Sequence, residues 1–159
     1  MTRERFIELA TAEQEPLRRF LLALCGGDRM EAEDIAQEAF IKAWLASERF
    51  DERYKFRTWL FKIAYRTLLD HAKLPQIERI PDHTELSVHS DYTADASFCY
   101  EALYRAIDQL PERARAATLL YHIEGYSIKD IATITHSNPV SVRQQLHRGL
   151  TRLRQILKP

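Results

Sequence analysis

The chain has 159 residues, of which 45% are hydrophobic and 29% charged, so it can form one domain or two small ones. Its two cysteines, Cys25 and Cys99, belong to no CxxC pair, which argues against a zinc site or a disulfide framework and fits a reducing cytoplasm. No apolar run approaches the roughly 18 residues of a membrane span, and the charged N-terminus lacks the apolar core of a signal peptide. We therefore expect a cytoplasmic protein, and the scarcity of glycine favours an all-α fold.

The net charge is zero, but the charge is arranged in blocks of alternating sign. Residues 1–50 carry a net charge of −3, residues 51–73 carry +3, residues 74–112 carry −6 and residues 113–159 carry +6. Two basic segments separated by an acidic one predict two nucleic-acid contacts on different parts of the chain.

Residues 3–24 have the pattern of an amphipathic helix that Gly26-Gly27 ends, and Asp28 is the candidate N-cap of a second helix over residues 30–47. The predicted core positions of the second helix are Ile35, Ala36, Ala39, Phe40, Ala43 and Trp44. Its opposite face carries Asp34, Gln37, Glu38, Ile41 and Leu45. Apolar side chains among acidic ones predict a docking surface. The alternative is that Ile41 and Leu45 pack on the first helix.

A polar loop over residues 48–55 leads into a third helix over residues 56–73. The predicted buried positions of this helix are Phe56, Trp59, Leu60, Ile63, Ala64 and Leu68. Cations of the loop and the helix alternate with the aromatic residues Tyr54, Trp59, Phe61 and Tyr65, a mixture that suits single-stranded nucleic acid. The alternative places these rings in the core of a bundle, and we prefer it for Trp59. The candidate contacts to the strand are Arg53, Tyr54, Lys55, Arg57, Lys62 and Arg66.

Residues 74–95 are polar and acidic and have no sustained periodicity, so we interpret them as a linker between two domains, residues 1–73 and 96–159. His83 and His89 within it lack the further ligands that a metal site needs. Helical periodicity returns at about Asp95, and Pro111 opens another helix that stops at Gly125.

Residues 126–154 read as a helix-turn-helix motif. Ser127 is the candidate cap of the first helix, while Asn138 and Pro139 suit the cap and first position of the second. The predicted apolar seam of the second helix is Val142, Leu146, Leu150, Leu153 and Leu157. The candidate DNA contacts are Asn138, Ser141, Arg143, Gln144, Gln145, His147, Arg148 and Arg152. Arginine reads guanine, glutamine reads adenine, and further arginines bind phosphate, although a solvated basic face would show the same pattern.

Together, these segments resemble a bacterial sigma factor of the extracytoplasmic-function (ECF) group. AEDIAQEAFIKAW (residues 32–44) looks like the segment that binds core polymerase, and FRTWLFKIAYRTLLDHAK (residues 56–73) looks like the helix that melts and reads the −10 element. LPERARAATLLYHIEGYSIKDIA (residues 110–132) and SVRQQLHRGLTRLR (residues 141–154) look like the domain that reads the −35 element.

The resemblance implies two small helical domains, of the sigma region 2 and region 4 types. It implies that Asp34, Gln37, Glu38 and Ile41 contact the coiled coil of the polymerase β′ clamp. Further partners would be the polymerase β flap, promoter DNA and an anti-sigma factor. The chain departs from the family pattern at His136, where glycine is usual, and at Ser137, where an apolar residue is usual. It also departs at two candidate DNA contacts, Gln145 and Arg66.

Two other classes of protein compete with this interpretation. A helix-turn-helix regulator that never binds polymerase would have no use for a second basic and aromatic segment. An enzyme is disfavoured because the chain has no Glu-x-x-His pair, GxxxxGK[ST], GxGxxG or HExxH motif. We therefore expect no catalytic residue, no metal ion and no cofactor.

Overall fold

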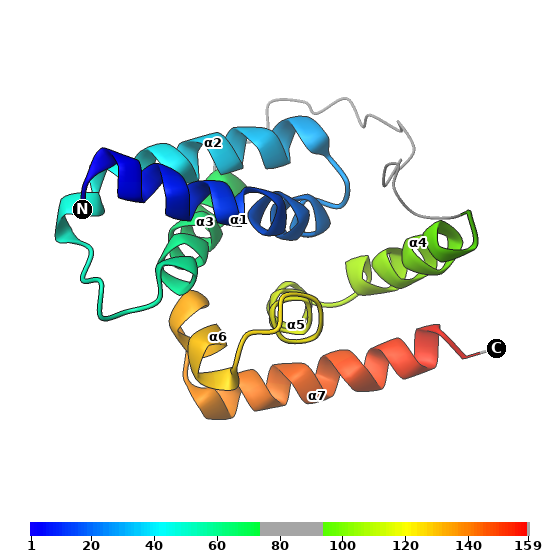
Figure 1. Ribbon diagram of the computed structural model, residues 1–159. Coiled ribbons are helices and arrows are strands. Elements are labelled where there is room, and N and C mark those ends of the chain that lie inside the picture. Colours follow the sequence, from blue (N-terminus) through cyan, green and yellow to red (C-terminus); the bar gives the residue numbers. More distant parts are fainter. Residues whose placement is uncertain (74–93, 159) are drawn as a thin grey trace.

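The computed structural model describes residues 1–73 and 94–158, and every regular element within them is helical (Figure 1). The first helices are α1 (Arg3–Leu24), α2 (Arg29–Leu45), the 3₁₀ turn η1 (Ser47–Arg49) and α3 (Phe56–Lys73). They are followed by α4 (Ala94–Asp108), α5 (Glu112–Thr118), the π-helical turn η2 (Leu119–Ile123), α6 (Ile128–Ile134) and α7 (Pro139–Ile156). The predicted all-α fold class is confirmed, whereas most of the predicted linker, with its two histidines, lies outside the described residues.

Helices α1, α2 and α3 pack on one another and form what we call the N-terminal unit, residues 1–73. Thr2 and Asp28 cap α1 and α2, because their side-chain oxygens accept hydrogen bonds from backbone N–H groups of the first turn. Gly26 and Gly27 have positive φ angles and end α1 as the sequence predicted. The fully buried side chains at the centre of this unit include Leu17, Phe20, Leu21, Ile35, Leu60 and Phe61.

Three aromatic residues of this unit are placed by the structure in a way that the sequence had not predicted or had left open. Trp44, predicted to be core, is 41% exposed, and its ring contacts that of Phe6 at a centroid distance of 5.1 Å. For Phe61 and Tyr65 the sequence left two positions open, stacking on nucleic acid or packing in the core of the bundle, and both side chains are buried. Helix α3 therefore has two buried faces, one toward α1 and α2 and one toward α6.

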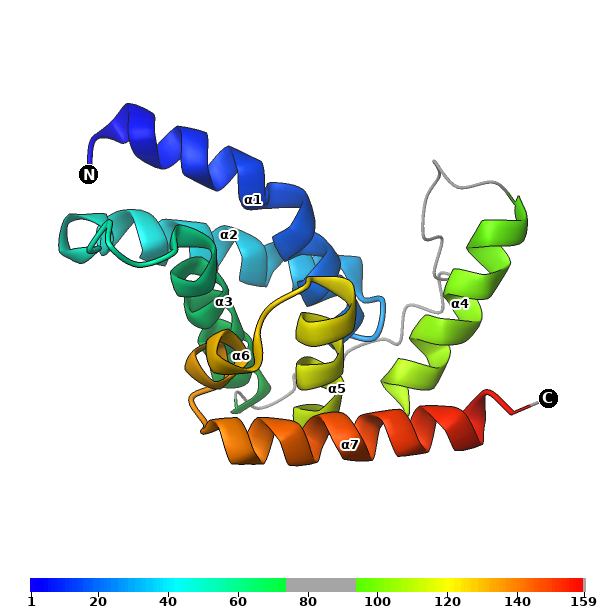
Figure 2. The same cartoon turned by 60° about the horizontal axis from the view of Figure 1, so that its bottom comes forward.

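The C-terminal unit, residues 94–158, is built on α7, which packs against α4, α5 and α6 (Figure 2). The predicted caps are confirmed: Ser127 Oγ accepts from the N–H of Asp130, and Asn138 Oδ1 accepts from the N–H of Ser141 at 2.9 Å. Within the predicted apolar seam, Val142 and Leu153 are buried, but Leu150 and Leu157 are exposed.

Gly149 explains why the buried face of α7 differs from the apolar seam that the sequence predicted. A Cβ atom at this position would lie 2.4 Å from Thr118 Oγ1 on α5, closer than any real contact. The absence of a side chain lets the two helices approach here, so the buried face is centred on Gly149 and Leu150 turns toward solvent.

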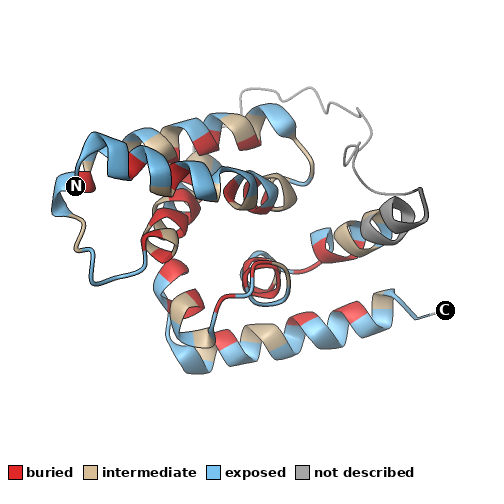
Figure 3. Ribbon diagram, in the orientation of Figure 1, coloured by how far each residue is buried: buried red, intermediate tan, exposed pale blue. Residues whose placement is uncertain are grey.

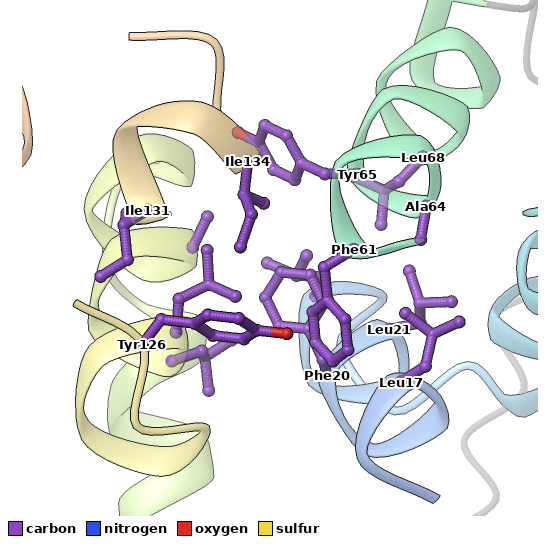
Figure 4. Packing of buried hydrophobic residues seen from close by; sticks show 14 of the residues in the cluster. Leu17, Phe20, Leu21, Phe61, Ala64, Tyr65, Leu68, Tyr126, Ile131 and Ile134 are labelled. Atoms are coloured by element: carbon purple, nitrogen blue, oxygen red, sulfur yellow. The ribbon is translucent and has the colours of Figure 1, made fainter. Parts of the chain in front are cut away.

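The N-terminal and C-terminal units share a continuous apolar core (Figure 3). Figure 4 shows the Tyr126 ring directed across the boundary toward Phe20 and Phe61, with Tyr65 and Ile134 beside them. The ring centroids of Phe61 and Tyr126 are 5.2 Å apart, and those of Phe20 and Phe61 are 5.4 Å apart. The second buried face of α3 is therefore covered by residues more than sixty positions further along the chain.

Candidate nucleic-acid interface

The exposed face of α7 carries the residues predicted to bind duplex DNA. Because Asn138 and Pro139 fix its first turn, the helix begins at a defined residue and its polar side chains fall on one side. The exposed members of this set are Asn138, Arg143, Gln144, His147, Arg148 and Arg152. By the rise of an α-helix, Arg148 lies about 7 Å and Arg152 about 13 Å along the axis from Arg143. One helix face thus offers side chains to a stretch of major groove and to the phosphates beyond it.

Electrostatics favour this face for an anion. Neither Arg143 nor Arg148 forms an ion pair with any described residue, and the only two acidic residues of segment 113–159 are Glu124 and Asp130. Both of these carboxylates pair with cations of the N-terminal unit, away from α7. The basic charge of α7 therefore stands without local neutralisation, as counterion-releasing DNA contacts require.

Three predicted members of the DNA face differ from the rest. Asn138 uses its side-chain oxygen to cap α7. Ser141 and Gln145 are half-buried and line a hollow of about 220 Å³ between the helix-turn-helix motif and the N-terminal unit. Tyr65 of α3 and Arg113 of α5 also line that hollow. Gln145 thus faces protein as well as solvent.

The turn before α7 contains a left-handed residue that is not glycine. His136 has a φ angle of +54°, in the region where glycine is favoured. The N–H of Ser137 donates to the carbonyl of Ala132, and the hydroxyls of Thr135 and Ser137 are 2.9 Å apart. These bonds hold the tight turn in spite of the unfavourable residue.

The candidate contacts to single-stranded nucleic acid fall into two groups. Arg53, Tyr54 and Arg66 are exposed, and Arg53 forms an ion pair with Asp51 that lowers the pKa of that carboxyl through its hydrogen bonds. Lys55 and Arg57 are turned toward the C-terminal unit and already have protein partners there. Lys62 is half-buried. The predicted nucleic-acid surface is therefore open to solvent at Arg53 and Tyr54 in the loop, whereas Lys55 and Arg57 at the start of α3 already contact the C-terminal unit.

The contacts of Lys55 and Arg57 were not foreseen from the sequence. Lys55 Nζ lies 3.0 Å from Asp130 Oδ2, and the Arg57 guanidinium lies over the Tyr126 ring, 4.5 Å from its centroid. Burial raises the pKa of the Tyr126 hydroxyl, which stays protonated and donates to the carbonyl of Arg57. A signal was present in the charge blocks, since Glu124 and Asp130 are the two acids of a basic segment.

The predicted docking face of α2 is open to solvent. Ile41 is 59% and Leu45 76% exposed, so the alternative in which they pack on α1 is wrong. Asp34 and Gln37 are exposed on the same face. Glu38 differs from them, because its carboxylate contacts His71 of α3 at 2.5 Å and Lys42 at 3.1 Å. These hydrogen bonds, the one from His71 first, lower the pKa of Glu38.

Two further searches concern metals and membranes. Within residues 1–73 and 94–158, no group of three or more His, Cys, Asp or Glu side chains could hold a metal ion. Over the same ranges, no helix combines the length and the hydrophobicity of a membrane span.

Comparisons with known proteins match both parts of the chain to one family. Residues 9–74 match the family Sigma-70 region 2, and residues 100–153 match Sigma-70, region 4. The RNA polymerase sigma-H factor of Pseudomonas aeruginosa is 32% identical over 154 residues, which cover 83% of this chain and 76% of that protein. The ECF RNA polymerase sigma factor SigW of Bacillus subtilis is 32% identical over 150 residues, with coverages of 83% and 78%.

Two solved structures share the fold at low sequence identity. The sigma factor RpoE from Bartonella quintana, in complex with the anti-sigma factor NepR, has a TM-score of 0.71 and 20% identity, covering 97% of this chain and 94% of that one. CnrH, in complex with the cytosolic domain of CnrY, has a TM-score of 0.74 and 21% identity, with coverages of 98% and 89%.

Proposed function

Since the chain belongs to the ECF group of RNA polymerase sigma factors, we propose that three of its surfaces divide the work of promoter recognition. A sigma factor directs RNA polymerase to promoters and is not itself an enzyme, so the residues to assign are binding residues. This membership also removes the alternative of a regulator that never meets polymerase. The assignment of individual residues is the substance of the proposal.

The first surface is the exposed face of α7, which would read the −35 duplex. The observation that carries the proposal is an exposed row of cationic and amide side chains on α7. Among the described residues, none forms an ion pair with Arg143 or Arg148. Arg143 and Gln144 lie near the start of the helix, where side chains reach base edges. Arg148 and Arg152 lie further along and would hold phosphates.

The second surface is the loop before α3 and the cations of that helix, which would hold the unpaired −10 strand. Tyr54 is exposed in the loop and offers a ring on which a base can stack, while Arg53 and Lys55 beside it are exposed cations. Flipping a base out of the duplex costs a few kcal/mol, least at easily unstacked steps, so opening would depend on the −10 sequence.

The third surface is the exposed face of α2, which would bind the coiled coil of the polymerase β′ clamp. Asp34 and Gln37 would supply polar contacts, and Ile41 and Leu45 would supply exposed apolar area. A second polymerase contact, of the C-terminal unit with the β flap, follows from the family alone.

The solved neighbour RpoE was captured with an anti-sigma factor, which supports the proposal that such a protein also restrains this chain. We further propose that residues 1–73 and 96–159 act as separate domains once on the promoter, with the acidic segment between them as the tether. A factor that joins polymerase on promoter DNA would work in the bacterial cytoplasm.

Run-off transcription with purified core polymerase and a library of genomic promoter fragments tests the proposed function. The chain should direct initiation from a small set of fragments that share a −35 and a −10 sequence, whereas core polymerase alone should not. A triple variant of α7, Arg143→Ala with Gln144→Ala and Arg148→Ala, should lose that selection. Equal initiation from all fragments, with and without the chain, would overturn the proposal.

A further inference from the structure

Given the function proposed for α7, on which this step rests, we infer that Val140 reads the 5-methyl group of a thymine in the −35 element. Val140 is the second residue of α7. It is 61% exposed, the highest value among the large apolar side chains of residues 101–158. A valine in that position adds an apolar contact to a face on which the other proposed base contacts are polar.

The helical position of Val140 places it in the middle of the proposed DNA face. Successive residues of an α-helix are about 100° apart, so in angle Val140 lies between Arg143 and Gln144. His147 lies two turns further along nearly the same line. The buried side of α7 includes Gly149, which is about 180° from Val140 by the same rotation. Figure 3 shows α7 exposed along the side that faces away from α5 and α6.

The fold itself gives no reason for a valine at this position. Among the described residues, the apolar core and the side chains packed against it do not include Val140. A β-branched side chain loses rotamer freedom in a helix, so valine forms helices less readily than alanine or glutamate. Single exposed apolar residues are common on protein surfaces. What distinguishes Val140 is that its neighbours on the helix face are the side chains proposed to meet base edges.

The chemistry of the side chain selects the base. The two methyl groups of valine neither donate nor accept hydrogen bonds, so a polar base edge pressed against them would lose water without compensation. Thymine is the base that presents a methyl group in the major groove, and apolar side chains contact it there.

The contact is also prepared before DNA arrives. Asn138 and Pro139 fix the first turn of α7, and valine has one strongly preferred rotamer in a helix. Little side-chain freedom is therefore lost on binding. Val140 lies about 5 Å along the axis from Arg143, and base pairs are stacked about 3.4 Å apart. The thymine should thus lie within one or two base pairs of the pair that Arg143 reads.

Substitution of single atoms in the DNA tests this contact. The full chain, assembled with core polymerase, is titrated with a promoter fragment chosen by the run-off selection. Each thymine of the −35 element, on either strand, is replaced in turn by deoxyuridine, which lacks only the 5-methyl group. The parent is compared with Val140→Ala and with Leu157→Ala. Leu157 is the matched control, because it is an exposed apolar residue at the opposite end of the same helix.

We expect one thymine at which deoxyuridine lowers the affinity of the parent and of Leu157→Ala about fourfold, the equivalent of one buried methyl group at about 0.8 kcal/mol. In Val140→Ala the same replacement should change the affinity by less than about twofold, and this difference measures the coupling between side chain and methyl group. Helical content should be unchanged, because the position is exposed and alanine favours a helix.

A second measurement adds the methyl group to a different base pair. With a C·G pair at the same position, the parent should bind 5-methylcytosine more tightly than cytosine by a similar factor, and Val140→Ala should not. Equal binding of the two cytosines by the parent would overturn the inference. So would the lack of a deoxyuridine effect at every −35 thymine, or an effect that is as large in Val140→Ala as in the parent.

Failure of this contact and failure of the proposed function give different results. If the parent holoenzyme does not distinguish the selected fragment from one with a scrambled −35 element, the function proposed for α7 fails. If it distinguishes them but deoxyuridine has no effect, only the contact between Val140 and a thymine methyl group fails.

Discussion

Glu38 of α2 and His71 of α3 are joined by a hydrogen bond of 2.5 Å between a carboxylate oxygen and Nε2. Lys42 Nζ lies 3.1 Å from the other oxygen of the same carboxylate. A residue that the family resemblance places on the polymerase surface therefore also ties two helices of the N-terminal unit together. Substitutions at Glu38 will mix an effect on stability with any effect on polymerase binding.

Glu38→Gln should lower stability at neutral pH and leave it unchanged in acid. The hydrogen bonds from His71 and Lys42 lower the pKa of Glu38 in the folded state below its unfolded value of 4.5. The stabilisation is therefore complete above that pH and is lost as the pH falls through the lower folded pKa. Because the side chain is partly exposed, we expect a difference of about 0.5–1 kcal/mol. Urea unfolding between pH 7 and pH 3 checks it, and a difference that does not change with pH would contradict it.

Asp34→Lys combined with Ile41→Ala should weaken binding to core polymerase at least tenfold without unfolding the protein. Both side chains are exposed on α2 and no described residue forms an ion pair with Asp34, so stability should change by less than about 0.5 kcal/mol. The measurement is a binding titration with core enzyme beside thermal unfolding. Glu15→Lys, an exposed position on α1, is the matched control. Equal affinities for the three proteins would remove the assignment of this face.

Arg143→Ala and Arg148→Ala should behave differently toward the −35 duplex. Arg143 lies near the start of α7, so its loss should cost about 1–3 kcal/mol and relax specificity at one base pair. Arg148 lies further along the helix, so its loss should weaken binding to all sequences alike and lower the salt slope by about one charge. Titrations against matched and mismatched duplexes at two salt concentrations separate the two effects. Unchanged discrimination in Arg143→Ala would show that the helix is docked differently.

Gly149→Ala should destabilise the C-terminal unit, although alanine ordinarily stabilises a helix relative to glycine. The new Cβ would meet Thr118 Oγ1 at 2.4 Å, and overpacking of this kind costs about 1–3 kcal/mol. The double variant with Thr118→Ala should recover most of the loss, because the next atoms lie at 3.6 Å and beyond. A double-mutant cycle by thermal unfolding measures the coupling. Additive effects would place the strain elsewhere.

His136→Gly should raise stability. The residue is exposed and has a φ angle of +54°, a conformation that costs an ordinary residue roughly 1 kcal/mol and costs glycine nothing. Part of the gain is offset because glycine has more freedom in the unfolded chain. Thermal unfolding of His136→Gly beside His136→Ala checks the prediction, since alanine should give no gain. A gain of equal size from both would mean that the imidazole, and not the backbone, carries the strain.

Local signals in the sequence predicted the helix ends well. Ser127, Asn138 and Pro139 mark the helix-turn-helix motif because capping depends on a side chain and the N–H group three residues later. The position of α7 against its neighbours was less accessible. The spacing of the leucines predicted that Leu150 is buried, but the close approach of α5 at Gly149 turns Leu150 toward solvent. A pattern of apolar side chains could not predict this, because glycine has no side chain to contribute to the pattern.

Long-range packing was beyond the sequence for a different reason. The sequence could not decide between base stacking and a core position for Phe61 and Tyr65, because the third helix already had a full apolar face without them. A second buried face of α3 needs a second element to cover it, and that element, α6, lies beyond the linker in the sequence. The predicted surfaces on α2 and α7 were recognisable because an exposed side chain needs no knowledge of its neighbours, whereas the occupied state of Arg57 depends on Tyr126.

The two sides of the boundary between the units are synthesised at different times, because they lie far apart in the sequence. Arg57 and Tyr126 are separated by 69 residues, so α3 leaves the ribosome well before the ring that covers it is made. At typical rates of 5–20 residues per second, this delay is roughly 3–14 s. During that time the Phe61 face of the nascent chain is uncovered, and transiently exposed apolar surface of this kind is prone to aggregate.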